Sequence, residues 1–180
     1  MKNNLQISKK FVLIIISVVF FFVSIFTFFS FVYQTSVITE SSQKDYFSLD
    51  QLNIVINKER VSRGIRPLAL NSKLNTAAQN KAFDMSEHNY FSHISPVDSK
   101  KWSDFIKDQK YEYSEAGENL ANGYEAPSEM VKAWMDSPSH RENILNKDVD
   151  ETGIGFIFSK LNGIPTIFVV QVFGKLDTNV

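Results

Sequence analysis

The chain of 180 residues contains no cysteine. Without thiols it has neither a disulfide scaffold nor a cysteine nucleophile. An exported domain of this kind depends on its hydrophobic core, and the roughly 128 residues between Tyr46 and Phe173 are enough for one self-sufficient domain. No internal repeat or low-complexity tract interrupts that part of the sequence.

An excess of positive charge is also absent. The 19 basic and 20 acidic residues give a formal net charge of −1. Three of the basic residues precede residue 11, so the rest of the chain carries 16 basic (19 less 3) and all 20 acidic residues, a charge of −4. Proteins that bind nucleic acid normally carry a basic stripe. The composition therefore predicts no nucleic-acid partner and no docking onto anionic headgroups.

One long segment lacks charge, glycine and proline altogether. Residues 11–33 hold eight of the sixteen phenylalanines. At about 1.5 Å per residue they span roughly 34 Å, enough to cross the hydrocarbon core of a bilayer with some tilt. A cleaved signal peptide has a shorter apolar region and a small-x-small cleavage site, and residues 33–37 offer no clean site of this kind. We therefore predict a transmembrane signal-anchor helix over residues 11–33, with secretion after cleavage as the alternative.

The charges that flank this segment predict its orientation. Three lysines and no acidic residue precede it, whereas Lys44 stands against Glu40 and Asp45 beyond it. The positive-inside rule then leaves the N-terminus in the cytoplasm and the rest outside the cell membrane. The predicted organisation is a cytoplasmic N-terminus (1–10), the anchor (11–33), a polar linker (34–45), one domain (46–174) and a short tail (175–180).

Hydrophobic spacing predicts helices first and strands last in the domain. The expected helices run from Ser48 to Arg60, from Asn71 to about His88, around Trp102–Ile106, and from Pro127 to Ser137, where Pro138 ends the last one. Residues 153–158 and 164–173 are rich in β-branched and aromatic residues, with a hairpin-turn signal between them, and residues 111–113 are a plausible third strand. This order predicts an α+β domain with helices packed on a small sheet.

Two of the three histidines and one glutamate hold most of the acid–base capacity of the chain. His93 precedes a proline by three residues, Glu118 follows 25 residues later, and His140 follows Pro138. If the three side chains converge, they make a polar pocket able to bind a divalent cation or to move a proton. Each also has a simpler interpretation: a loop imidazole on a backbone carbonyl, a carboxylate on backbone amides, and a histidine at a helix start.

The sequence gives less support to a serine-hydrolase triad or to a zinc-dependent active site. Several serines lie near the histidines, but no Gly-x-Ser-x-Gly elbow is present, so a serine-hydrolase triad is not predicted. Two neutral imidazoles and a carboxylate can form a three-ligand zinc site with one position open for water. His93 and His140 are therefore candidate zinc ligands, with Glu118 as base in a metal-assisted hydrolase. No compact ligand motif such as His-Glu-x-x-His supports that site.

The order of these motifs resembles the CAP superfamily, which comprises cysteine-rich secretory proteins, antigen 5 and plant pathogenesis-related proteins, and in particular its cysteine-free bacterial branch. The resemblance covers roughly residues 50–174. The matching positions are Asn57, Arg60, Gly64 and Leu68, then Phe91-Ser92-His93, Gly117-Glu118-Asn119-Leu120, Ser137-Pro138-Ser139-His140-Arg141, and Gly153-Ile154-Gly155. The resemblance implies an α-β-α sandwich whose central cleft is lined by His93, Glu118 and His140.

The chain departs from this family at one position. Larger CAP proteins carry a second cleft glutamate just after the tryptophan of the fourth helix, where this sequence has Ser137; Asp136 and Glu142 are the alternatives. CAP-like proteins as a group are associated with lipid binding, signalling and envelope contacts, with no shared reaction. We therefore predict a membrane-tethered binding module for a small ligand, lipid or envelope component, with the metal-assisted hydrolase or a structural envelope protein as alternatives.

Overall fold

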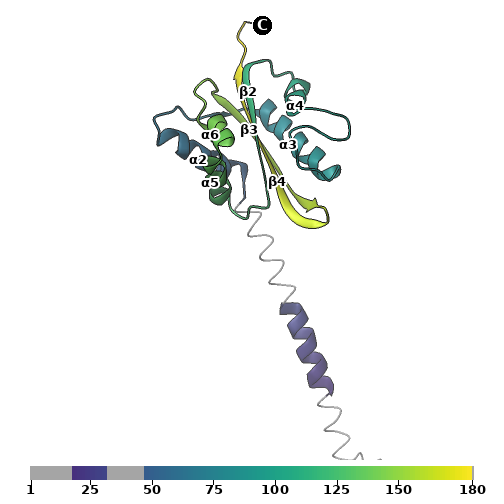
Figure 1. The fold of residues 1–180 in the computed structure, drawn as a ribbon. Helices are drawn as coiled ribbons and strands as arrows, with labels where there is room; N and C mark the ends of the chain where they lie inside the picture. The colour runs from purple at the N-terminus through teal and green to yellow at the C-terminus, as the bar shows by residue number, and fades with distance from the viewer. Residues whose placement is uncertain (1–17, 32–46, 180) are drawn as a thin grey trace, which may run out of the picture. The chain divides into compact units, whose positions relative to one another are not determined.

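The computed structural model describes residues 18–31 and 47–179. The chain divides into two units, Met1–Asp45 and Tyr46–Val180 (Figure 1). The second unit contains all the strands and both hydrophobic cores found in the described residues.

In the first unit the described residues 18–31 are helical and lie inside the predicted anchor. Within the parts of the chain that the structure describes, no helix is both long and apolar enough to cross a membrane. The ends of the predicted anchor, the cytoplasmic N-terminus (1–10) and the linker (34–45) lie outside those parts.

The second unit alternates helices with a small mixed sheet. Its elements are α2 (Leu49–Val61), β1 (Ala69–Leu70), α3 (Ser72–Glu87), α4 (Trp102–Asp108), β2 (Tyr113–Asn122), α5 (Pro127–Asp136), α6 (Pro138–Leu145), β3 (Glu151–Leu161) and β4 (Ile164–Leu176).

Side chains cap the starts of α2 and α3. The Ser48 hydroxyl accepts a hydrogen bond from the Gln51 N–H at the start of α2. The Asn71 side chain accepts from two backbone N–H groups at the start of α3. Such caps satisfy donors that the helix itself leaves unpaired.

The end of α5 differs from the prediction. Ser137 does end this helix, but Pro138 opens a further helix, α6, instead of a loop. Proline is well tolerated at the first position of a helix, because the N–H that it lacks has no partner there. His140 therefore lies in the first turn of a helix.

The four strands lie in the order β1-β3-β4-β2. Short β1 pairs parallel with β3, and the other pairs are antiparallel. The hairpin between β3 and β4 turns at Asn162 and Gly163, whose φ angles of 52° and 82° suit a type I′ turn. The third strand was predicted too short: β2 extends through Asn122. In addition, β4 continues to Leu176, two residues into the predicted tail.

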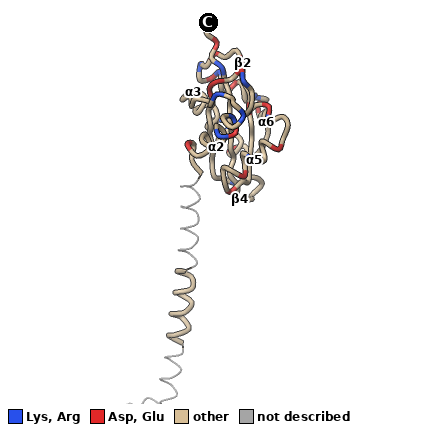
Figure 2. Tube along the Cα trace, turned by 90° about the vertical axis from the view of Figure 1, so that its left-hand side faces the viewer, with Lys and Arg blue, Asp and Glu red and all other residues tan. Residues whose placement is uncertain are grey.

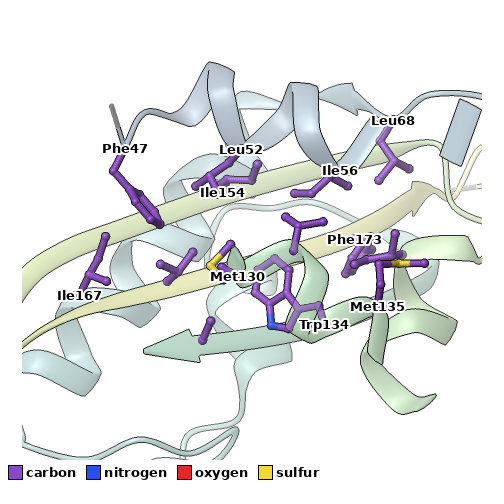
Figure 3. Close-up of a cluster of buried hydrophobic side chains, with 14 of the residues drawn as sticks. Phe47, Leu52, Ile56, Leu68, Met130, Trp134, Met135, Ile154, Ile167 and Phe173 are labelled. Carbon is purple, nitrogen blue, oxygen red and sulfur yellow. The ribbon is translucent and has the colours of Figure 1, made fainter. Parts of the chain in front are cut away.

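Helices cover both faces of the sheet (Figure 1). On one face α2, α5 and α6 enclose a core that includes Leu52, Ile56, Trp134 and Phe173 (Figure 3). On the other face α3 and α4 enclose a second core. These layers form the predicted α-β-α sandwich, and β2 forms one edge of its sheet. Figure 2 shows basic and acidic residues intermixed over this unit.

Candidate functional site

The loop between α3 and α4 fixes the backbone of His93. The His93 carbonyl accepts a hydrogen bond from the N–H of Trp102, the first residue of α4. Next to it, Ile94 and Lys101 form an isolated antiparallel bridge that closes the loop. The backbone of His93 therefore lies beside the start of α4.

The alternation of side chains along β2 sends neighbouring residues to opposite faces of the sheet. Ala116 and Leu120 pack in the core under α3 and α4, whereas Ala121 packs in the other core. Glu118 consequently faces the α3–α4 layer, from which His93 comes, and Asn119 faces the layer that contains α6.

His93 and Glu118 form a close pair. The His93 Nδ1 lies 2.5 Å from Glu118 Oε2, and the side chains of the two residues are 53% and 1% exposed, respectively. The second carboxylate oxygen, Oε1, is buried and has no hydrogen-bond partner among the described residues. The hydrogen bond that His93 donates to Glu118 raises the pKa of His93 above its ordinary value. Burial raises the pKa of Glu118, against the opposing effect of the His93 contact.

On the other face of β2, two asparagines attach α6 to the strand. Asn119 Nδ2 donates to the backbone carbonyl of His140 at 3.1 Å. Asn143 Nδ2 donates to Asn119 Oδ1 at 2.9 Å and to the Glu118 carbonyl at 3.0 Å. Burial lowers the pKa of the His140 imidazole, and the nearby charge of His93 lowers it further. The charges of the two imidazoles therefore interact.

One more side chain bonds to the backbone of β2. The indole N–H of Trp134, which is buried in the α5 side of the core, donates to the Leu120 carbonyl at 2.9 Å. Trp134 and Asn143 thus donate to the carbonyl oxygens of Leu120 and Glu118, which are two residues apart on the edge strand β2.

The remaining sequence candidates lie away from the His93–Glu118 pair. Asp136 is exposed and pairs with Lys132 on the outside of α5 at 2.6 Å, and Glu142 is exposed on α6. The third histidine, His88, is exposed and contacts the Asp84 carboxylate on its own helix.

The zinc prediction can be compared with the donor groups present. Within the described residues, no group of three or more His, Cys, Asp or Glu side chains is arranged to hold a metal ion. The Glu118 carboxylate is engaged by His93 instead of standing beside it as a further ligand. A zinc site normally takes at least three protein ligands, and the described residues present no such set; the zinc site at His93 and His140 stays a prediction.

The family model of the cysteine-rich secretory proteins, CAP, matches residues 54–173. The chain belongs to this family. The CAP region is 40% identical over 119 residues to YkwD of Bacillus subtilis, covering 66% of this chain and 44% of that protein. It is 33% identical over 110 residues to the membrane protein YlbC of the same organism, covering 59% and 30%. The chain thus matches less than half of the length of these relatives.

Solved structures share the CAP fold. An extracellular protein with an SCP domain from Bacillus anthracis superposes with a TM-score of 0.61 at 28% identity, covering 70% of this chain and 39% of that one. An outer surface protein from Borrelia burgdorferi gives 0.59 at 28% identity, covering 70% and 90%. The predicted resemblance to a cysteine-free bacterial CAP domain is confirmed.

Sequence reasoning missed three residues around the CAP site: Lys81, Tyr90 and Asn143. Lys81 was detectable in principle, because it occupies an apolar position in the helical stripe of α3 and is 1% exposed. Asn143 gave no signal, because the helix that carries it was not predicted.

The titration of His93 predicts a pH dependence of CAP-domain stability. A folded pKa above the unfolded value of about 6.5 gives stability that is complete below 6.5 and is lost as pH rises through the folded value. His140, with its lowered pKa, acts in the opposite sense and only below about 6.5. We expect urea denaturation of the metal-free domain to show a falling free energy of unfolding from about pH 6.5 upward, and Glu118→Gln to flatten that slope. An equal slope in the variant would contradict the coupling of the pair.

Proposed function

We propose that this CAP domain is a binding module that works outside the cytoplasm and presents the His93 imidazole to a small ligand, lipid or cell-envelope component. The observation that carries the proposal is the half-exposed imidazole hydrogen-bonded to a carboxylate that is 1% exposed. Burying a carboxylate is costly unless it is paired. The simpler interpretation of His93, an imidazole on a backbone carbonyl, is wrong, because Nδ1 bonds Glu118 instead.

Apolar side chains of the same loop support a ligand with an apolar part. Phe91, Ile94 and Val97 are 39%, 49% and 63% exposed. Binding sites combine apolar surface with a few placed polar groups, and clustered exposed apolar residues commonly mark contact surfaces. The loop offers both kinds of group within seven residues.

The proposed location follows from the flanking charges and from the relatives. Relatives of this chain are an extracellular protein, an outer surface protein and a membrane protein by name. We propose a single-pass anchor over residues 11–33, with the N-terminus cytoplasmic and the CAP domain extracytoplasmic. Protease added outside intact cells should degrade the domain. If the domain appears in the medium without the anchor, secretion after cleavage replaces this part of the proposal.

The hydrolase alternative loses support from the position of Glu118. A general base must reach the proton that it removes, directly or through one water. The Glu118 side chain lies behind His93 and is 1% exposed, so the group that faces solvent is the imidazole. This geometry favours the binding module over a hydrolase in which Glu118 activates water.

Ligand-dependent stabilisation tests the proposal. We expect at least one member of a panel of lipid micelles, fatty acids, cell-wall glycans and zinc to raise the melting temperature of residues 46–180. A ligand at 100 times its Kd stabilises the folded state by about 2.7 kcal/mol. His93→Gln should abolish the shift.

His88→Gln is the matched control, because His88 is a surface histidine of the same domain that contacts only its own helix. It should retain the full shift. A panel without any stabilising member, or equal shifts in the two variants, would refute binding at His93. A shift with zinc alone would instead restore the metal site.

A further inference from the structure

The outer edge of β3 is covered along only part of its length. In the sheet order β1-β3-β4-β2, β3 pairs with β4 on one side, and short β1 pairs with it on the other side only at Glu151 and Thr152. The register with β4 runs without a shift from Glu151 to Leu161. The N–H and C=O groups of alternate residues therefore face away from β4 along the whole strand, and these outward groups need other partners.

Beyond β1, side chains of α3 supply such partners. Asn75 Oδ1 accepts a hydrogen bond from the Ile154 N–H at 2.9 Å. Gln79 bonds both outward groups of Phe156: its Oε1 accepts from the N–H at 3.2 Å, and its Nε2 donates to the carbonyl at 3.1 Å. The outward groups thus belong to the even-numbered residues of β3. The two amides act on them as a neighbouring strand would, so this part of the edge is occupied.

The next two outward residues, Phe158 and Lys160, have no such partner. Outside the ladder with β4, their backbone N–H and C=O groups make no hydrogen bond with any residue that the structure describes. Both residues are exposed. The end of β3 consequently offers two donors and two acceptors, roughly 7 Å apart along the strand, which is the spacing that a further strand bonds to.

An exposed aromatic ring lies on the α3 side of this open edge. Phe83 is 51% exposed. Gln79, one turn earlier on α3, bonds to Phe156, and the hydroxyl of Ser86, about one turn later, lies 2.7 Å from the hydroxyl of Ser159. Phe83 therefore lies beside the part of β3 between these two contacts, where the amide partners end.

A second aromatic ring and a lysine lie on the opposite face of the edge. The Phe158 ring contacts Phe47 and Phe156 at centroid distances of 6.3 Å and 6.1 Å, and Phe158 remains 36% exposed. Lys160 follows on the same face and has no ion pair with the described residues. Opposite charges directly across neighbouring strands stabilise their pairing. The side chains thus favour an apolar residue opposite Phe158 and an acidic residue opposite Lys160.

We propose that the open edge at Phe158 and Lys160 binds an extended peptide segment, which adds to the sheet as a strand and carries an apolar side chain opposite Phe158 and a carboxylate opposite Lys160. In this mode the backbone hydrogen bonds supply affinity and the flanking side chains supply selectivity. A second copy of the chain offers no acidic residue in the matching stretch from Phe158 to Leu161. The opposite edge of the sheet, β2, carries Glu118, so this surface is separate from the His93 site and independent of the proposed function.

Backbone amide NMR of the ¹⁵N-labelled full chain in detergent tests the proposal with the peptide acetyl-Thr-Asp-Thr-Val-Thr-amide. In antiparallel pairing its aspartate lies opposite Lys160 and its valine opposite Phe158. We expect the N–H signals of Phe158 and Lys160 to shift with peptide concentration, and those of Ile154 and Phe156 to shift much less, because α3 already bonds them. A peptide with N-methyl groups on its aspartate and valine should bind at least about fivefold more weakly, because each hydrogen bond contributes roughly a two- to tenfold change in the binding constant.

Variants of the edge provide a second measurement. Lys160→Pro removes one outward donor but leaves the ladder with β4 intact, since this N–H faces away from β4, and Phe83→Ala removes an apolar flank. Each should weaken binding at least about threefold. Ile54→Ala is the matched control, because Ile54 is 59% exposed on α2, and it should leave the affinity unchanged.

Three results would overturn the proposal: no shift of the Phe158 and Lys160 signals at millimolar peptide, equal binding of the N-methylated peptide, or shifts confined to the His93 loop. Dimerisation of the free chain that moves the same two signals would also overturn it, since a second copy then occupies the edge. If Lys160→Pro does not fold, the N-methylated peptide on the wild type decides.

Discussion

Replacing Gly153 with alanine is expected to destabilise the CAP domain by at least about 3 kcal/mol, or to prevent folding. A Cβ at this position would lie 2.0 Å from the carbonyl carbon and 2.2 Å from the carbonyl oxygen of Leu74. Both atoms belong to the backbone of α3, which packs along β3, so no side-chain rotation relieves the clash. Urea denaturation measures the loss.

Gly163→Ala is the control. Nothing lies within 4 Å of a Cβ at Gly163, but its φ of 82° makes alanine cost roughly 1–2 kcal/mol. A smaller loss in Gly153→Ala than in Gly163→Ala would show that the helix can move away from the sheet, which is inconsistent with the contact described.

The second large effect is expected at Arg60. Its guanidinium is 1% exposed and donates to four backbone carbonyls, those of Arg66, Ile144, Asn146 and Val149, at 2.7–3.3 Å. Arg60→Met keeps much of the side-chain bulk but leaves these carbonyls without their donors. Each unsatisfied buried group costs about 1–3 kcal/mol, so we expect a loss of roughly 3–5 kcal/mol in urea denaturation.

Arg63, two residues beyond the end of α2, provides the matched control. It forms an exposed ion pair with Glu59. Such pairs contribute about 0–1 kcal/mol, so Arg63→Met should change the free energy of unfolding little. Equal losses in the two variants would mean that Arg60 acts through general helix stability instead of through the four carbonyls that it bonds.

The sequence predicted helix starts and the hairpin turn correctly, because these depend on interactions between residues close together in the chain. Ser48 and Asn71 cap helices, and Asn162-Gly163 turns a hairpin, because each acts on its own neighbours. Pro138 misled the prediction because proline both ends one helix and suits the start of the next. The length of β2 was missed because its polar residues Glu118 and Asn119 are buried by partners distant in sequence.

The sequence predicted which residues belong to the candidate site better than it predicted how they are arranged. The motif order named His93, Glu118 and His140, and the structure places the first two in direct contact. His140 makes no hydrogen bond to either of them among the described residues; its backbone carbonyl accepts from Asn119, and its place in the cleft stays a prediction. Lys81 interrupts the apolar stripe of α3 at a position where a core residue is expected, and this signal was not used in the sequence analysis.

The side chains bonded to β2 also bear on how the domain behaves among other chains. An edge strand with unpaired backbone groups is a template to which a foreign strand can add. Here the indole of Trp134 and the amide of Asn143 occupy the Leu120 and Glu118 carbonyls, two acceptors that point the same way along the strand. A second chain would have to extract a core tryptophan before it could pair, so this edge resists strand exchange and aggregation. In the proposed function, recognition beside this edge therefore falls to side chains such as the imidazole of His93.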